Sequence, residues 1–150
     1  MTTDKTNIGF SLRKVTTEQF AIIETSFEES KQIQLKADLR FGINNENKAI
    51  STYFSINLLQ EKVPFLILEI GCHFNISEDA WSEFLNADKS ELIFPKGFMS
   101  HLVMLTIGTA RGVLHSKTEN TPFNRFLLPT LNVNEMVLND VSFNTQSETN

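Results

Sequence analysis

Hydrophobic and polar residues alternate along three segments in the first half of the chain. The clearest alternation runs from residue 32 to residue 44, where every odd-numbered residue is apolar. Two further alternations cover residues 49–59 and 63–74. A repeat of two residues predicts β-strands with one buried and one wet face. The short polar connections at residues 44–48 and 61–62 predict hairpins, so these strands form an antiparallel sheet.

The strand predicted at residues 63–74 is apolar on both faces. Leu68 lies on one face, whereas Phe65 lies on the other. The second face then needs a cover, which is either a helix or a partner subunit. Upstream, residues 8–13 predict an opening strand, and the apolar residues 20–23 either extend it or form a strand of their own.

The second half of the chain predicts helices. Ser77 is a good N-cap and two acidic residues follow it, so a short helix begins there and ends near Asn86. A long helix spans roughly residues 98–116, and a short one covers residues 135–138, capped by Asn134. The long helix is apolar nearly all round, which predicts burial on several sides.

These elements predict an α+β fold: a four-stranded antiparallel sheet, arranged as a meander, packed with one long and one or two short helices. A chain of 150 residues fits one domain, so we expect a single domain over residues 1–150. The polar ends, residues 1–6 and 144–150, are expected to be disordered tails. A long helix this apolar is hard for one chain to cover, and oligomerisation is the natural remedy.

Charge and composition exclude several classes of function. The net charge is −5 and the basic residues are scattered singly, so no basic stripe for nucleic acid is present. The first residues lack the design of a signal peptide. The uncharged run between Lys96 and Arg111 is too short and too polar to span a bilayer. We therefore expect a soluble cytoplasmic protein without membrane insertion.

No residue pattern predicts catalysis or a metal site. Cys72 falls on the apolar face of its strand, where a free cysteine acts as a small hydrophobe. Residues 108–112 are glycine-rich but lie inside a helix, so they form no phosphate loop. We interpret Arg111 as a structural or hydrogen-bonded residue rather than as a contact to a ligand. The histidines lie on separate elements without the spacing of metal ligands: His73, His101 and His115. We expect a protein that is not an enzyme and uses no cofactor.

The order of these pieces resembles the SecB family of export chaperones. The matching residues run from about Asn7 to Phe143 and include the strand at 65–70, Phe94-Pro95 before the long helix, and Leu128-Pro129 with Asn132 before the last helix. The resemblance implies an ATP-independent holdase that binds unfolded preprotein clients in an apolar groove. It also implies a homotetramer, built as a dimer of dimers, that delivers clients to the SecA motor.

The resemblance assigns three groups of residues. The client groove is expected at the loop and terminal helix: Phe123, Phe126, Leu127, Leu131 and Met136. Each of these side chains has an alternative role in filling the core. The oligomer interface is expected on the long helix: Phe98, Leu102, Leu105, Gly108 and Gly112. Candidate acidic contacts to the motor are Glu69, Glu18 and Glu24.

The chain also departs from the export members of the family. Acidic positions of their first strand fall here near Gln19 and Ile23, and the tail retains only Glu148 as a charge. A second interpretation is therefore a SecB-like chaperone dedicated to a toxin–antitoxin pair. A third is a protein that binds a small apolar ligand between sheet and helix, and a fourth is an adaptor for one folded partner.

Overall fold

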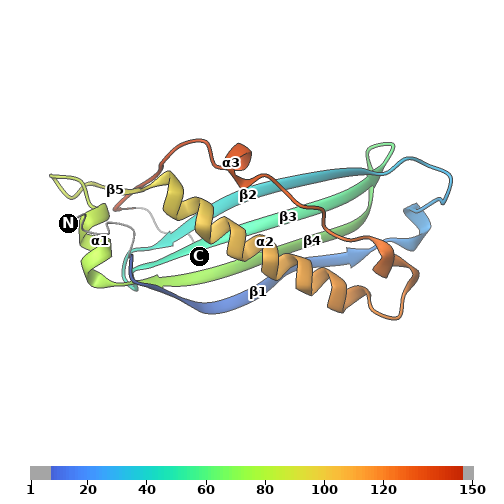
Figure 1. Ribbon diagram of the computed structural model, residues 1–150, viewed down its shortest axis with the longest axis horizontal. Helices are drawn as coiled ribbons and strands as arrows, with labels where there is room; N and C mark the ends of the chain where they lie inside the picture. Colours follow the sequence, from blue (N-terminus) through green and yellow to red (C-terminus); the bar gives the residue numbers. More distant parts are fainter. Residues whose placement is uncertain (1–7, 147–150) are drawn as a thin grey trace.

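Four long strands form an antiparallel sheet in the computed structural model, which describes residues 8–146 (Figure 1). The strands are β1 (Phe10–Ile22), β2 (Gln34–Asn44), β3 (Ala49–Gln60) and β4 (Val63–Ile76), in the sheet order β1-β4-β3-β2. The α+β fold class is confirmed. The meander comprises β2 to β4, and β1 lies beyond β4, where Val15 pairs with Cys72. The expected tails at residues 1–6 and 147–150 lie outside the described residues.

The opening strand and the apolar piece at residues 20–23 belong to one strand, β1. Its pairing with β4 is interrupted twice, between Leu12 and Lys14 and between Thr17 and Gln19. Each interruption is a β-bulge, at which one extra residue on β1 has no partner on β4. Because of these bulges, residues 10–22 form one long strand although their apolar and polar residues do not alternate strictly.

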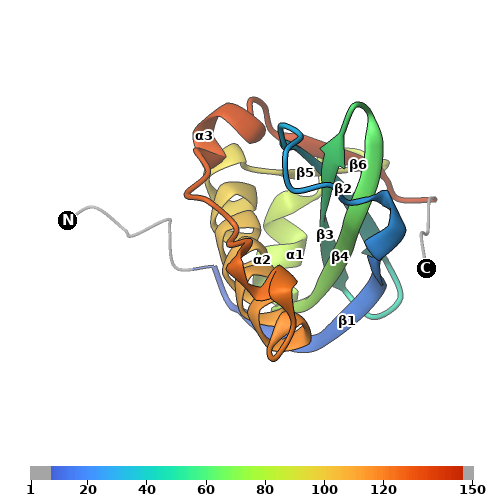
Figure 2. The ribbon, with the colours of Figure 1, turned by 90° about the vertical axis from the view of Figure 1, so that its right-hand side faces the viewer.

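Helix α2 (Lys96–Thr118) packs on one face of the sheet, mainly over β3 and β4 (Figure 2). We call this the helix-side face and the opposite one the outer face. By length and composition alone α2 would suffice to cross a membrane. It is nevertheless a core helix, because Leu102, Val103 and Ala110 are fully buried.

The two short helices lie where the sequence predicted them, and the predicted cap is correct for the first of them only. Helix α1 (Glu78–Phe84) is capped by Ser77, whose side chain accepts a hydrogen bond from the backbone nitrogen of Ala80. Helix α3 (Val133–Met136) begins earlier than predicted, and its cap is Asn132 rather than Asn134. Two 3-10 helices, η1 (Glu24–Ser26) and η2 (Pro122–Arg125), complete the helical elements of the described residues.

A second, two-stranded sheet was not predicted. Strand β5 (Glu91–Phe94) precedes α2 and pairs with β6 (Val141–Asn144), with Leu92 opposite Phe143. Residues 144–146 were expected to belong to a disordered tail, and this was wrong. The Thr145 carbonyl accepts a hydrogen bond of 2.9 Å from Asn45 Nδ2, because β6 carries the chain end back onto the main sheet.

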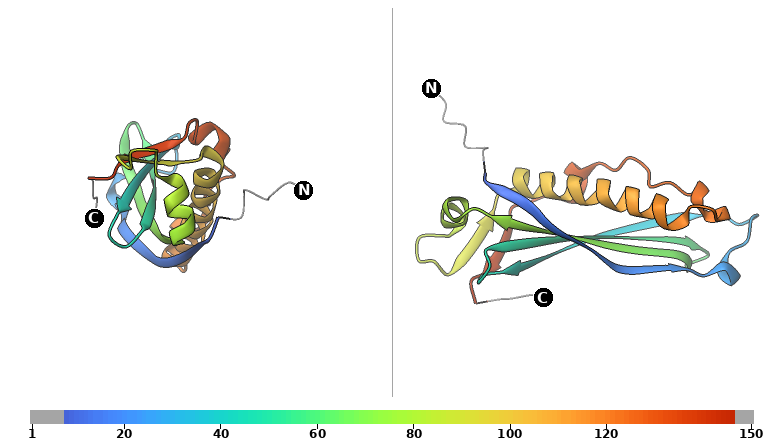
Figure 3. Two further views of the ribbon diagram at one scale, coloured as in Figure 1. Left: turned by 90° about the vertical axis from the view of Figure 1, so that its left-hand side faces the viewer. Right: turned by 90° about the horizontal axis from the view of Figure 1, so that it is seen from below.

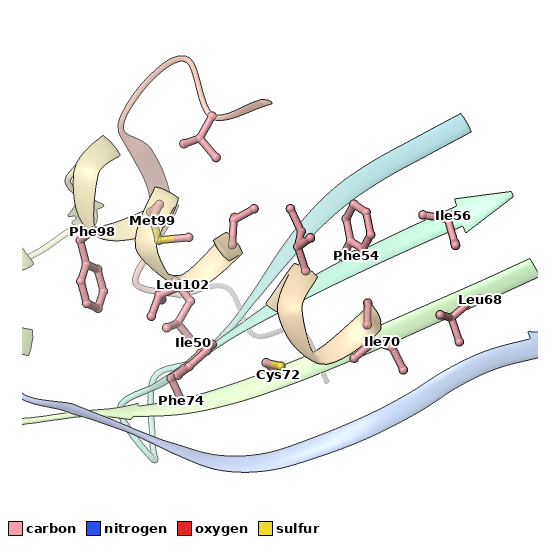
Figure 4. Packing of buried hydrophobic residues seen from close by; sticks show 14 of the residues in the cluster. Ile50, Phe54, Ile56, Leu68, Ile70, Cys72, Phe74, Phe98, Met99 and Leu102 are labelled. Atoms are coloured by element: carbon pink, nitrogen blue, oxygen red, sulfur yellow. The ribbon is translucent and has the colours of Figure 1, made fainter. Parts of the chain in front are cut away.

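The core lies between α2 and the helix-side face (Figure 4). Ile50, Phe54 and Phe74 of the sheet meet Met99 and Leu102 of α2, and these side chains are almost fully buried. A polar pair also lies within this layer, where the hydroxyls of Thr52 and Thr106 bond to each other. Thr106 also donates to the carbonyl of Leu102, which satisfies the buried pair.

Candidate functional site

The helix-side face is covered unevenly from strand to strand. Leu39 of β2 pairs with Phe54 of β3, which pairs with Ile70 of β4, so the three side chains share this face. Phe54 and Ile70 are fully buried, whereas Leu39 is only partly buried. Leu35, further along β2, is 37% exposed. Because α2 lies over β3 and β4, the apolar face of β2 extends beyond the cover of the helix.

The chain after η2 forms a second, thinner cover on the same side of the sheet (Figure 3). We call residues 126–138 the C-terminal segment. Arg111 of α2 holds it by donating hydrogen bonds to the carbonyls of Leu128, at 3.3 Å, and Pro129, at 3.2 Å. Leu128 and Val137 are buried and anchor the segment to the core. Arg111 thus has the structural role that the sequence favoured.

Partly exposed apolar side chains lie on both β2 and the C-terminal segment. Several of them contact the core without being covered by it, which leaves apolar area in water. We call this set the apolar strip: Leu35, Leu39, Phe41, Phe126, Leu127, Leu131 and Met136. Its residues have no catalytic chemistry, and what they can do is bind other apolar side chains.

The residues predicted for a client groove divide into two groups. Phe123 is buried, and its ring packs at 5.4 Å from Phe27 and 6.2 Å from Phe65, so it belongs to the core. Phe126 touches the same cluster and remains partly exposed. Leu127 is 69% exposed. The remaining two predicted residues, Leu131 and Met136, are partly buried at the surface.

Sequence reasoning missed the contribution of β2 to the strip. The alternation over residues 32–44 identified which side chains share a face, but it predicted that this face is buried. Only the position of α2 over the neighbouring strands reveals that Leu39 and Phe41 are partly exposed. No signal within β2 itself distinguishes a covered from an uncovered strand.

The residues predicted for an oligomer interface point in two directions. Phe98 and Leu102 face the sheet and are buried, so they need no second subunit to cover them. Leu105, Gly108 and Gly112 lie on the outward side of α2 and are exposed. We call this side the outward stripe, and it also includes Met104, which is 58% exposed.

Within residues 8–146, no side chain or distant backbone packs against the two glycines of the outward stripe. Apart from the neighbouring backbone of α2 itself, a Cβ atom added at Gly108 or Gly112 would meet no described atom within 4 Å. Glycine inside a helix costs about 1 kcal/mol relative to alanine. The helix therefore carries two destabilising residues whose small size leaves space on its outward side.

Two of the three predicted motor contacts meet on the outer face. Arg40 Nε lies 3.4 Å from Glu69 Oε2, and Arg40 Nη2 lies 3.8 Å from Glu18 Oε1. The same guanidinium stacks over the ring of Tyr53, with 3.7 Å between its carbon and the ring centroid. Glu24 is not part of this cluster, because it lies exposed on η1.

A polar network surrounds His73 on the same outer face. Its Nδ1 lies 2.7 Å from Ser51 Oγ and its Nε2 lies 2.9 Å from Thr16 Oγ1. Burial is the main cause that lowers the pKa of His73, and the Lys14 ammonium adds to it. Within residues 8–146, no three His, Cys, Asp or Glu side chains are grouped so that they could hold a metal ion.

Among solved structures, the fold resembles that of the Mycobacterium tuberculosis Rv1957 SecB-like chaperone in complex with a ChAD peptide from the Rv1956 HigA1 antitoxin. The TM-score is 0.52 at 11% sequence identity, over 82% of this chain and 90% of that chain. A protein of unknown function from Streptococcus agalactiae has a TM-score of 0.34 at 13% identity, over 83% and 98% of the chains, which supports no argument. No protein-family model and no curated protein sequence matches the chain. The chain has a SecB-like fold.

Proposed function

We propose that this protein is an ATP-independent holdase chaperone that binds non-native client chains along the apolar strip. The observation that carries the proposal is the incomplete cover of β2, which leaves Leu35 and Leu39 in contact with water. Each Leu or Phe that a client buries fully contributes about 1.5–3 kcal/mol. Several such contacts give affinity without a strict sequence requirement. Binding and release need no cofactor and no covalent step.

Two kinds of client fit this surface. The SecB-like protein of similar fold carries a peptide from an antitoxin, which supports a dedicated, aggregation-prone client for this chain as well. Export of preproteins in the cytoplasm, with docking to SecA, is the second candidate. Arg40 pairs with Glu18 and Glu69 and partly neutralises two of the three acidic residues expected to contact the motor. We therefore favour the dedicated client.

We further propose that the chain assembles as a homotetramer, built as a dimer of dimers, in which the outward stripe of α2 supplies one of the two interfaces. Met104 and Leu105 expose apolar area there, and Gly108 and Gly112 leave room for a second backbone. The destabilising effect of two helical glycines is offset if a partner helix packs closely against them. Light scattering measures the mass directly.

A cavity for a small apolar ligand between sheet and helix is another alternative. Side chains from both layers occupy this space, among them Phe54 and Ile70 of the sheet and Met99 and Leu102 of α2 (Figure 4). The apolar area available for binding lies at the surface of the strip instead. This placement favours a chain-like client over a small enclosed molecule.

The test compares two double variants in suppression of client aggregation without ATP. Leu35→Gln with Leu127→Gln removes two exposed apolar side chains from the strip. Val63→Gln with Ile93→Gln removes two exposed side chains elsewhere, at 50% and 38% exposure, and serves as the matched control. We expect at least a tenfold loss of suppression in the first variant only. Equal activity of the two variants, with unchanged circular dichroism, would overturn the placement of the client on the strip.

A further inference from the structure

The outer face of the sheet contains a hollow that has no part in the proposed client surface. Its volume is about 200 Å³, and Arg13 and Lys14 of β1, Ser51 and Tyr53 of β3, and His73 of β4 line it. This is room for several waters or for one oxyanion with part of its hydration shell. The hollow lies across the sheet from α2, because its lining residues alternate with the buried core residues.

A β-bulge brings two cations to this hollow. Consecutive residues of a regular strand point to opposite faces, so neighbouring basic residues would normally be separated. Here Lys14 stands opposite His73, and Arg13 is the extra residue in the register shift after Leu12. Both side chains therefore line the same hollow. Bulges often redirect a side chain in this manner next to functional sites.

Neither cation has a carboxylate partner within residues 8–146. The ion pairs formed by the described residues involve other basic side chains, and the acid nearest in sequence, Glu18, pairs with Arg40. The chain as a whole has a net charge of −5, so acidic partners are abundant elsewhere. Two adjacent positive charges without a partner make the hollow a place where an anion is electrostatically favoured.

Hydrogen-bond donors complete the lining. Ser51 bonds to His73 Nδ1 and Thr16 bonds to His73 Nε2, so each hydroxyl can donate or accept as the imidazole tautomer changes. The charged groups around the imidazole are Arg13, Lys14 and Glu18 of β1, and Tyr53 of β3 is the titratable neighbour. Burial is the main cause that lowers the pKa of His73, Lys14 and Arg13 lower it further, and Glu18 acts in the opposite direction.

We propose that this hollow binds one oxyanion of phosphate size, with Arg13 and Lys14 as its charge partners and the Ser51 hydroxyl as a neutral donor. Arginine presents a planar fork of donors that matches phosphate geometry, and lysine adds a compact charge. The site is independent of the apolar strip, because the two lie on opposite faces of the sheet.

The experiment titrates the full chain with inorganic phosphate at constant ionic strength. Calorimetry gives the affinity, and the ring signals of His73 in an NMR spectrum report the location. We expect saturable binding that shifts His73, and at least a tenfold weaker affinity when Arg13→Gln is combined with Lys14→Gln. The matched control combines Lys36→Gln with Lys96→Gln, which removes two exposed charges outside the hollow, and should bind as the parent does.

A parallel titration with O-phosphoserine distinguishes a free anion from a phosphate group carried by a larger molecule. Tighter binding of the ester assigns the hollow to a carried phosphate group, and equal or weaker binding assigns it to the free anion. Either outcome, with loss in the Arg13 and Lys14 variant alone, supports the site. Absence of saturable binding, or an equal loss in both double variants, would overturn it.

Discussion

Strands β2 and β4 present the same alternation of apolar residues to the helix side, yet β4 is buried along this face, whereas β2 is fully buried there only near its end, at Ile43. Ile70 is fully enclosed, and Leu39, which shares its row through Phe54, is not. The difference comes from the position of α2 rather than from the composition of either strand. A functional surface can therefore arise in this fold without a special motif, simply where an ordinary core strand extends beyond its cover.

The largest expected effect comes from one substitution made on both strands. Leu68→Ala on β4 removes a side chain that is 1% exposed and should reduce the free energy of unfolding by about 2–5 kcal/mol. Leu39→Ala on β2 should cost about half of that or less, because water already reaches this side chain. Urea denaturation measures both values. Equal losses would show that β2 is as well covered as β4.

A second test substitutes alanine for glycine at a crowded position, Gly71, and at two open positions on the outward stripe. A Cβ atom at Gly71 would lie 2.7 Å from Thr16 Oγ1 and 2.8 Å from a ring carbon of Tyr53. Gly71→Ala should therefore destabilise the fold by about 1–3 kcal/mol through overpacking. A melting temperature equal to that of the parent would mean that Tyr53 moves aside at no cost.

The same substitution on the outward stripe should have the opposite sign. Gly108→Ala and Gly112→Ala have free space around them and should each stabilise the helix of a single chain by about 0.5–1 kcal/mol. If copies of the chain pack at this stripe, the added methyl groups should at the same time reduce the mass seen in light scattering. Stabilisation with no change in mass would remove the stripe from the interface.

The smallest effect concerns the pH dependence of the outer face. Burial and neighbouring cations lower the pKa of His73 below 6.5 in the folded chain. As the pH falls below 6.5, the unfolded chain binds a proton before the folded chain does, so stability decreases with falling pH until the folded pKa is reached. His73→Gln should flatten this part of the stability profile. A profile with the same slope in the variant would assign the decrease to other groups.

Much of the fold followed from the sequence because its signals are local. Strict alternation located β2 to β4 to within about two residues, and the Ser77 cap located α1. Strands β5 and β6 have four residues each, too few to show a period, and they pair across a separation that no local pattern reports.

The errors in the site have one physical cause, which is long-range packing. Phe65 was placed on the second face of its strand by alternation. That face was expected to need a cover, and Phe65 is fully buried beside a register shift at the start of β4, packed against Phe123 and Phe126. Local periodicity cannot reveal a bulge, and it cannot reveal which strands a helix covers. These two facts account for the misplacement of Phe123 and for the omission of β2 from the strip.

The C-terminal segment is fixed at both ends, by Arg111 on α2 and by the pairing of β6 with β5. The entropy lost in ordering this part of the strip is therefore spent during folding and not during client capture. A preorganised surface retains more of its contact energy as affinity than a loop that must first become ordered. Most of the conformational entropy lost on binding is then lost by the client. A client that is more disordered when free loses more entropy and therefore binds more weakly.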